Sequence, residues 1–150
     1  MGRGVCFHRG GAVGADQGVT RLFYDGGCGL CHAAVRFLAR HDGAGRIRFA
    51  PLEGTTFQRL VPAASRGALP DSLVALTPEG RLLTRSDAVV HLLRTLGGFW
   101  VAWARLLAAL PRPLRDGLYG LVARFRARLF RRPEGACPVL PSALLNRFDL

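Results

Sequence analysis

The sequence predicts an α/β fold in which strands and helices alternate. Short runs rich in β-branched and aromatic residues recur between segments whose apolar residues have helical spacing, and glycine or proline turn signals separate them. The chain has 150 residues, of which 49% are hydrophobic. That length and composition suit one folded domain with a hydrophobic core and hardly allow two.

A first strand and a first helix are predicted on either side of a turn. Residues 19–24 (VTRLFY) favour a strand, which ends where Asp25, Gly26 and Gly27 signal a turn. Residues 30–41 favour a helix, because their larger apolar side chains fall on one face.

A second strand and a short helix follow. Residues 46–52 (RIRFAPL) alternate in character and predict a strand. Residues 55–61 (TTFQRLV) predict a short helix that Gly54 or Thr55 would cap.

A hairpin and a longer helix complete the predicted core. Residues 72–77 and 81–85 flank a Pro-Glu-Gly turn, which predicts two paired strands. Ser86 or Asp87 then caps a helix with an apolar stripe, and the glycine pair at positions 97 and 98 ends it.

The predicted order is strand, helix, strand, helix, strand, strand, helix (βαβαββα), which is that of the thioredoxin-like core. Two additional C-terminal helices are predicted over residues 99–110 and 113–130. We expect a flexible N-terminal tail over residues 1–18, the thioredoxin-like domain with its helical extension over residues 19–132, and a C-terminal tail over residues 133–150.

The net charge of +11 favours acidic partners. The 21 basic residues are all arginine and are spread along the chain without aromatic interleaving, so no specific nucleic-acid binding is expected. The first 18 residues contain no apolar segment of the kind that a secretory signal needs. We therefore expect a cytoplasmic, reducing environment, where a C-x-x-C pair is more often catalytic or metal-binding than a structural disulfide.

Cys28 and Cys31 form such a C-x-x-C pair where the first predicted helix begins. A helix N-terminus offers unpaired N–H groups and a partial positive charge, which stabilise Cys28 as an attacking thiolate. Cys31 lies one turn further on, beside the buried face, which suits a resolving thiol. We predict a thiol-disulfide oxidoreductase whose cysteine pair needs no bound cofactor and whose substrates are protein or small-molecule disulfides and thiols.

Three alternatives use the same residues. A c-type haem would need His32 as an axial ligand, but the chain contains no Met except Met1 to supply a second ligand. Zinc could use Cys28, Cys31 and Cys137 with a histidine, although a second close cysteine pair is missing. A non-enzymatic interaction module would use the pair only as a structural or zinc-binding element. The strand before the pair and the helix after it favour redox chemistry over all three, so no metal site is predicted.

Tyr24, Asp25 and Gly26, followed by Cys28 and Cys31, resemble the signature of the DCC family of predicted thiol-disulfide oxidoreductases. The resemblance implies a thioredoxin-like fold and a proposed disulfide-exchange activity. It also marks the aspartate and the two cysteines as the signature positions.

The resemblance extends well beyond that motif. Residues 72–98 look like the family's hairpin and the start of its next helix, and residues 115–126 together with Cys137 resemble its C-terminal part. It marks Ser86 and Asp87 as secondary candidates for the site.

Two positions are informative by comparison with thioredoxins. Those proteins carry a buried carboxylate six residues before the nucleophile, where this chain has Leu22. Asp25 is the obvious replacement for proton transfer, but it could equally hold the turn, and we favour the turn role. Pro70 lies near the place of the thioredoxin cis-proline, where an X-Pro bond makes the cis form accessible.

The remaining histidines and cysteines have simpler interpretations. By helical angle His32 faces away from the apolar stripe and is expected to meet solvent. His41 and His91 are expected to be ordinary surface or helix-end residues. Cys137 is expected to be a small buried residue rather than a third redox thiol.

The two C-terminal helices allow two interpretations. The one that we favour is that they pack on the core and on each other. The other is a peripheral membrane contact with an anionic surface, to which the basic amphipathic helix over residues 113–130 is suited.

Overall fold

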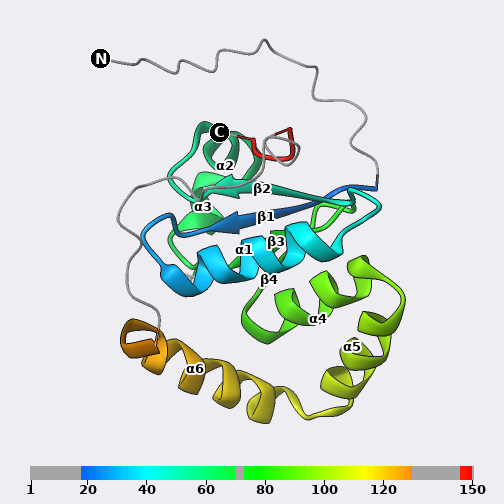
Figure 1. The fold of residues 1–150 in the computed structure, drawn as a ribbon. Helices are drawn as coiled ribbons and strands as arrows, with labels where there is room; N and C mark the ends of the chain where they lie inside the picture. The colour runs from blue at the N-terminus through cyan, green and yellow to red at the C-terminus, as the bar shows by residue number, and fades with distance from the viewer. Residues whose placement is uncertain (1–17, 70–72, 130–145, 150) are drawn as a thin grey trace.

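The computed structural model describes residues 18–69, 73–129 and 146–149, and these form a mixed sheet with helices on both faces (Figure 1). The sheet has four strands in the order β2-β1-β3-β4. β1 runs parallel to β2 and antiparallel to β3, and β4 is antiparallel to β3. The strands are β1 (Thr20–Tyr24), β2 (Ile47–Pro51), β3 (Val74–Leu76) and β4 (Leu82–Thr84).

The helices agree with the predicted order and confirm a mixed α/β fold consistent with a thioredoxin-like core plus C-terminal helices. They are α1 (Gly29–His41), α2 (Thr55–Leu60), α3 (Ala63–Arg66), α4 (Arg85–Leu96), α5 (Phe99–Ala109) and α6 (Arg112–Leu129). The short α3 was not predicted, because four residues show no helical periodicity.

The two faces of the sheet bury two separate clusters. Leu22 and Tyr24 of β1 pack with α1 and α4, whereas Phe23 between them packs with α2. This alternation is what a strand with a period of two produces. Phe23 meets Phe57 edge to face with 5.0 Å between the ring centroids. Burying such a side chain stabilises the fold by about 2–3 kcal/mol.

The predicted cap of α4 is wrong. Thr84 is the N-cap residue and makes no hydrogen bond to the helix through its side chain. Ser86 instead donates a hydrogen bond to Asp116 of α6. Asp87 accepts one from Arg115, also of α6, over 3.1 Å. These polar groups therefore join α4 to α6 and are not used for capping.

The chain returns to the sheet after α6. Residues 146–149, which were predicted to belong to the C-terminal tail, run beside β2. Phe148 forms a parallel bridge with Phe49, and their rings stack with 5.2 Å between centroids. The Phe49 amide donates to the Arg147 carbonyl and the Asp149 amide donates to the Phe49 carbonyl.

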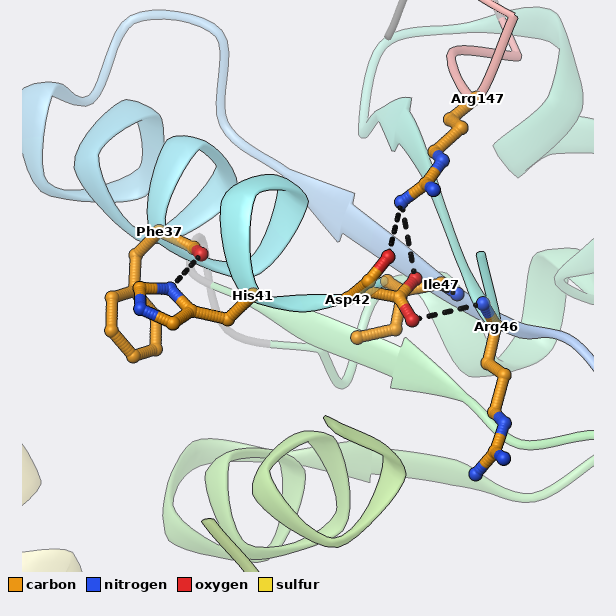
Figure 2. A network of polar contacts seen from close by, with 6 residues as sticks. All are labelled: Phe37, His41, Asp42, Arg46, Ile47 and Arg147. Atoms are coloured by element: carbon orange, nitrogen blue, oxygen red, sulfur yellow. Dashed lines mark hydrogen bonds and ion pairs between the residues drawn. The ribbon is translucent and has the colours of Figure 1, made fainter. Parts of the chain in front are cut away.

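A buried carboxylate connects three parts of this arrangement (Figure 2). Asp42, which follows α1, accepts hydrogen bonds from the amides of Arg46 (3.1 Å) and Ile47 (2.8 Å). Arg147 donates to the Asp42 backbone carbonyl over 2.8 Å, and its guanidinium lies 3.4 Å from the carboxylate. The end of α1, the start of β2 and the C-terminal segment thus meet at one side chain.

Candidate active site

The cysteine pair lies at the start of α1. Figure 1 shows the turn that leads from the end of β1 into this helix. Cys28 is the N-cap residue of α1, and its sulfur accepts a hydrogen bond from the amide of Cys31 over 3.4 Å. A sulfur in the N-cap position faces the unpaired N–H groups of the first helical turn. The predicted placement of the first cysteine at a helix N-terminus is therefore confirmed.

The turn before Cys28 is held by Asp25. Its carboxylate oxygen accepts the Gly27 amide over 2.8 Å, and its backbone carbonyl accepts the Cys28 amide over 3.2 Å. A side chain that bonds its own backbone two residues on is a recognised device for fixing a turn. The Asp25 side chain thus holds the turn before Cys28, which is the role favoured from the sequence.

Cys31 is the less accessible of the two thiols. It is 3% exposed, against 8% for Cys28, and no disulfide joins the two. Burial raises the pKa of Cys31 to about 12, and Cys28 adds to this effect through a hydrogen bond and, when it is ionised, through its charge. At neutral pH Cys31 is therefore a protonated thiol that donates toward Cys28.

His32 is buried, which corrects the expectation that it meets solvent. Its Nε2 lies 2.7 Å from the Gly26 carbonyl, which can only accept, so Nε2 carries the proton. Its ring meets that of Tyr24 edge to face, 5.9 Å between centroids. Helical periodicity gives the side of α1 on which His32 lies, but the turn before Cys28 folds over that side. His32 thus ties the turn to the helix.

The other predicted site residues have different neighbours. Tyr24 and Gly26 contact His32, as described above. Ser86 and Asp87 bond to α6, and Ala88 of the same helix belongs to the buried cluster that contains both cysteines. Leu22 is fully buried in that cluster. Pro70 and Cys137 lie outside the described residues.

His91 also differs from the surface residue that was expected. It is half-buried on α4, and its Nε2 lies 2.9 Å from the hydroxyl of the buried Thr20. Burial lowers the pKa of His91. His41 is exposed as expected, and its Nδ1 donates to the Phe37 carbonyl over 2.8 Å.

In residues 18–69, 73–129 and 146–149 no three His, Cys, Asp or Glu side chains gather so that they could hold a metal ion. His32, which a haem would use, directs its Nε2 to the Gly26 carbonyl.

We expect the reduced protein to lose stability as the pH rises above about 9. The pKa of Cys31 is about 12 in the folded protein against an ordinary value of 9.0, so the unfolded chain gives up this proton first. Stability then falls by up to about 1.4 kcal/mol per pH unit between the two values. Urea denaturation with reductant at pH 8 and pH 10 measures the loss. It should be smaller in Cys31→Ser, and equal losses in the two proteins would contradict the raised pKa.

Comparisons with known proteins found a matching family model and similar proteins. The model of the DCC1-like thiol-disulfide oxidoreductase family matches residues 22–132. The uncharacterized protein YuxK of Bacillus subtilis is 33% identical over 131 residues, which cover 85% of this chain and 91% of YuxK. A chloroplastic DCC family protein of Arabidopsis thaliana is 30% identical over 113 residues, 75% of this chain and 66% of that protein. No solved structure matches the chain.

Proposed function

Because the chain belongs to the DCC1-like thiol-disulfide oxidoreductase family, we propose that it exchanges disulfides through Cys28 and Cys31. The observation that carries the proposal is the hydrogen bond from the Cys31 amide to the Cys28 sulfur at the start of α1. This bond and the helix N-terminus both favour negative charge on that sulfur. The family assignment alone supports only a redox role, and the geometry supports the assignment of the two steps.

In the first step the Cys28 thiolate attacks one sulfur of a substrate disulfide. A bond forms between Cys28 and that sulfur, the substrate disulfide breaks, and the other substrate sulfur leaves as a thiolate. In the second step Cys31 gives up its proton and attacks the Cys28 sulfur. The Cys28–Cys31 disulfide forms and the second substrate thiolate leaves, so the substrate gains the two electrons that the cysteine pair loses. The reverse sequence oxidises a substrate dithiol.

The raised pKa of Cys31 fits this order of events. Before the first step, the negative charge of Cys28 and the hydrogen bond to it help to keep Cys31 protonated. Once Cys28 is bound in a mixed disulfide, both of these contributions are gone and only burial and the charge of Asp25 oppose ionisation. Cys31 thus becomes a better nucleophile when it is needed. We assign the proton to Asp25, whose carboxylate holds the turn before Cys28 and whose charge acts on the Cys31 thiol, so one side chain would serve both roles.

The substrates that we propose are protein or small-molecule disulfides. Cys28 is the more exposed thiol, and the adjoining turn presents an exposed Gly27 and a Gly26 next to which a side chain would meet open space. Neither glycine has a positive φ, so backbone conformation does not require them. Their small size leaves room on the approach to Cys28.

Equilibration in glutathione buffers of graded potential tests the proposal. After acid quenching and alkylation, the protein should pass in one two-electron step from two free thiols to a Cys28–Cys31 disulfide, which peptide mass spectrometry identifies. A Cys6→Ser, Cys137→Ser double variant should show the same transition, and Cys28→Ser should lack it. If Cys28 and Cys31 form no disulfide in any buffer, the proposal is wrong.

A further inference from the structure

Helix α6 presents its apolar face to solvent, the reverse of an ordinary surface helix. Four large side chains spaced four, three and four residues apart form one stripe, with Val122 beside it. All five are 45–52% exposed: Leu114, Leu118, Leu121, Val122 and Phe125. Several large apolar side chains that are exposed side by side usually mark an interaction site.

The opposite side of α6 explains this orientation. Of the α6 side chains that the structure describes, only Arg115 is buried. It bonds to Asp87 of α4 over 3.1 Å, and Asp116 accepts a hydrogen bond from Ser86. The helix is therefore held on the domain by charged and polar side chains, and its apolar stripe takes no part in that contact.

Helix α5 carries a second stripe of the same kind. Phe99, Trp103 and Leu106, spaced four and three residues apart, are 68%, 47% and 59% exposed. Other side chains attach α5 to the domain. Trp100 packs on Phe37 of α1 with 4.9 Å between ring centroids, and Ala104 is fully buried. Each of the two helices thus packs on the domain with one side and leaves an apolar side exposed to solvent.

The charges around these stripes are of one sign. Residues 99–129 contain a single acidic residue, Asp116, which faces α4. The same residues contain the arginines at positions 105, 112, 115, 124, 126 and 128. Exposed Arg105 and Arg124 are on α5 and α6 respectively. The exposed sides of α5 and α6 therefore combine Phe, Trp and Leu side chains with positive charge. Among their described residues there is no exposed negative charge.

We propose that α5 and α6 attach the protein to the surface of an anionic phospholipid membrane. Phe, Trp and Leu side chains suit the boundary between headgroups and acyl chains, and the arginines complement lipid phosphates. No helix in the described residues is long and apolar enough to cross a bilayer. The helices accordingly lie in the plane of the interface, with the sheet and its cysteine pair on the aqueous side.

Flotation of the full chain with vesicles tests this proposal. At physiological salt the protein should float with vesicles of phosphatidylcholine and phosphatidylglycerol, and far less with vesicles of phosphatidylcholine alone. The double variant Leu118→Gln, Phe125→Gln changes only exposed side chains, so it should fold normally, as circular dichroism would verify. It should lose most of the binding.

A pair of matched charge variants distinguishes membrane attachment through α5 and α6 from a general attraction of the positively charged protein to anionic lipid. Arg124→Glu on α6 should weaken binding about tenfold. Arg59→Glu makes the same charge change at an exposed position of α2, beyond the opposite face of the sheet, and should have little effect. Equal losses in both variants would overturn the proposal. So would the absence of vesicle binding, including the case in which light scattering shows that the stripes join two copies of the chain.

Discussion

Replacing Cys28 with serine is expected to abolish disulfide exchange. A serine hydroxyl in the N-cap position can still accept the Cys31 amide, but it cannot form a disulfide with the substrate. Turnover should fall at least about a thousandfold, to the rate without protein. Reduction of a fluorogenic peptide disulfide, with a chemical thiol as the electron donor, measures this loss.

Replacing Cys31 with serine should have a different outcome. Cys28 can still attack, so the mixed disulfide forms, but no thiol remains to release it. The Cys31→Ser protein should therefore accumulate substrate bound at Cys28, visible as an added mass that reductant removes. Cys6→Ser is the matched control, because that residue lies outside the matched family region, and it should keep full activity. Trapping at any cysteine other than Cys28 would contradict the assigned roles.

The sequence predicts the elements around the site well because each depends on local chemistry. The β-branched and aromatic run before Asp25 and the apolar periodicity after Cys28 give the bounds of β1 and α1 to within one residue. The glycine-rich turn separates them. Placing Cys28 at the start of a helix needs no knowledge of distant residues.

The features that the sequence does not predict depend on residues brought together by the fold. His32 becomes buried because the preceding turn covers it, and the Gly26 carbonyl accepts a hydrogen bond from its ring. Phe148 pairs with Phe49 across about a hundred residues of chain. Periodicity within one segment contains no information about either contact, and both follow from tertiary packing.

The orientation of α6 could not be predicted from its sequence pattern. Its apolar stripe is visible in the sequence, and such a stripe ordinarily faces the core. Here Asp87 and Ser86 of α4 bind Arg115 and Asp116 of α6, which fixes the helix with its polar side inward. A pattern along one helix cannot show that a partner helix carries the matching polar groups.

Replacing Asp42 with alanine is expected to destabilise the protein by about 3–4 kcal/mol. The buried carboxylate accepts the amides of Arg46 and Ile47 and lies 3.4 Å from the Arg147 guanidinium. Alanine leaves two backbone donors without their acceptor and a positive charge beside an apolar side chain. In a domain of this length the melting temperature should fall by roughly 10 °C, which differential scanning fluorimetry would detect.

Two further variants identify which contact of Asp42 is responsible. Arg147→Ala removes the guanidinium together with its hydrogen bond to the Asp42 backbone carbonyl, but it leaves the carboxylate bonded to both amides, so it should cost clearly less than Asp42→Ala. Glu53→Ala removes an exposed carboxylate and should change stability by no more than about 0.5 kcal/mol. If Arg147→Ala is as damaging as Asp42→Ala, the attachment of residues 146–149 outweighs the amide bonds. If Asp42→Ala costs under about 1 kcal/mol, the carboxylate does not join α1 to β2 as the structure indicates.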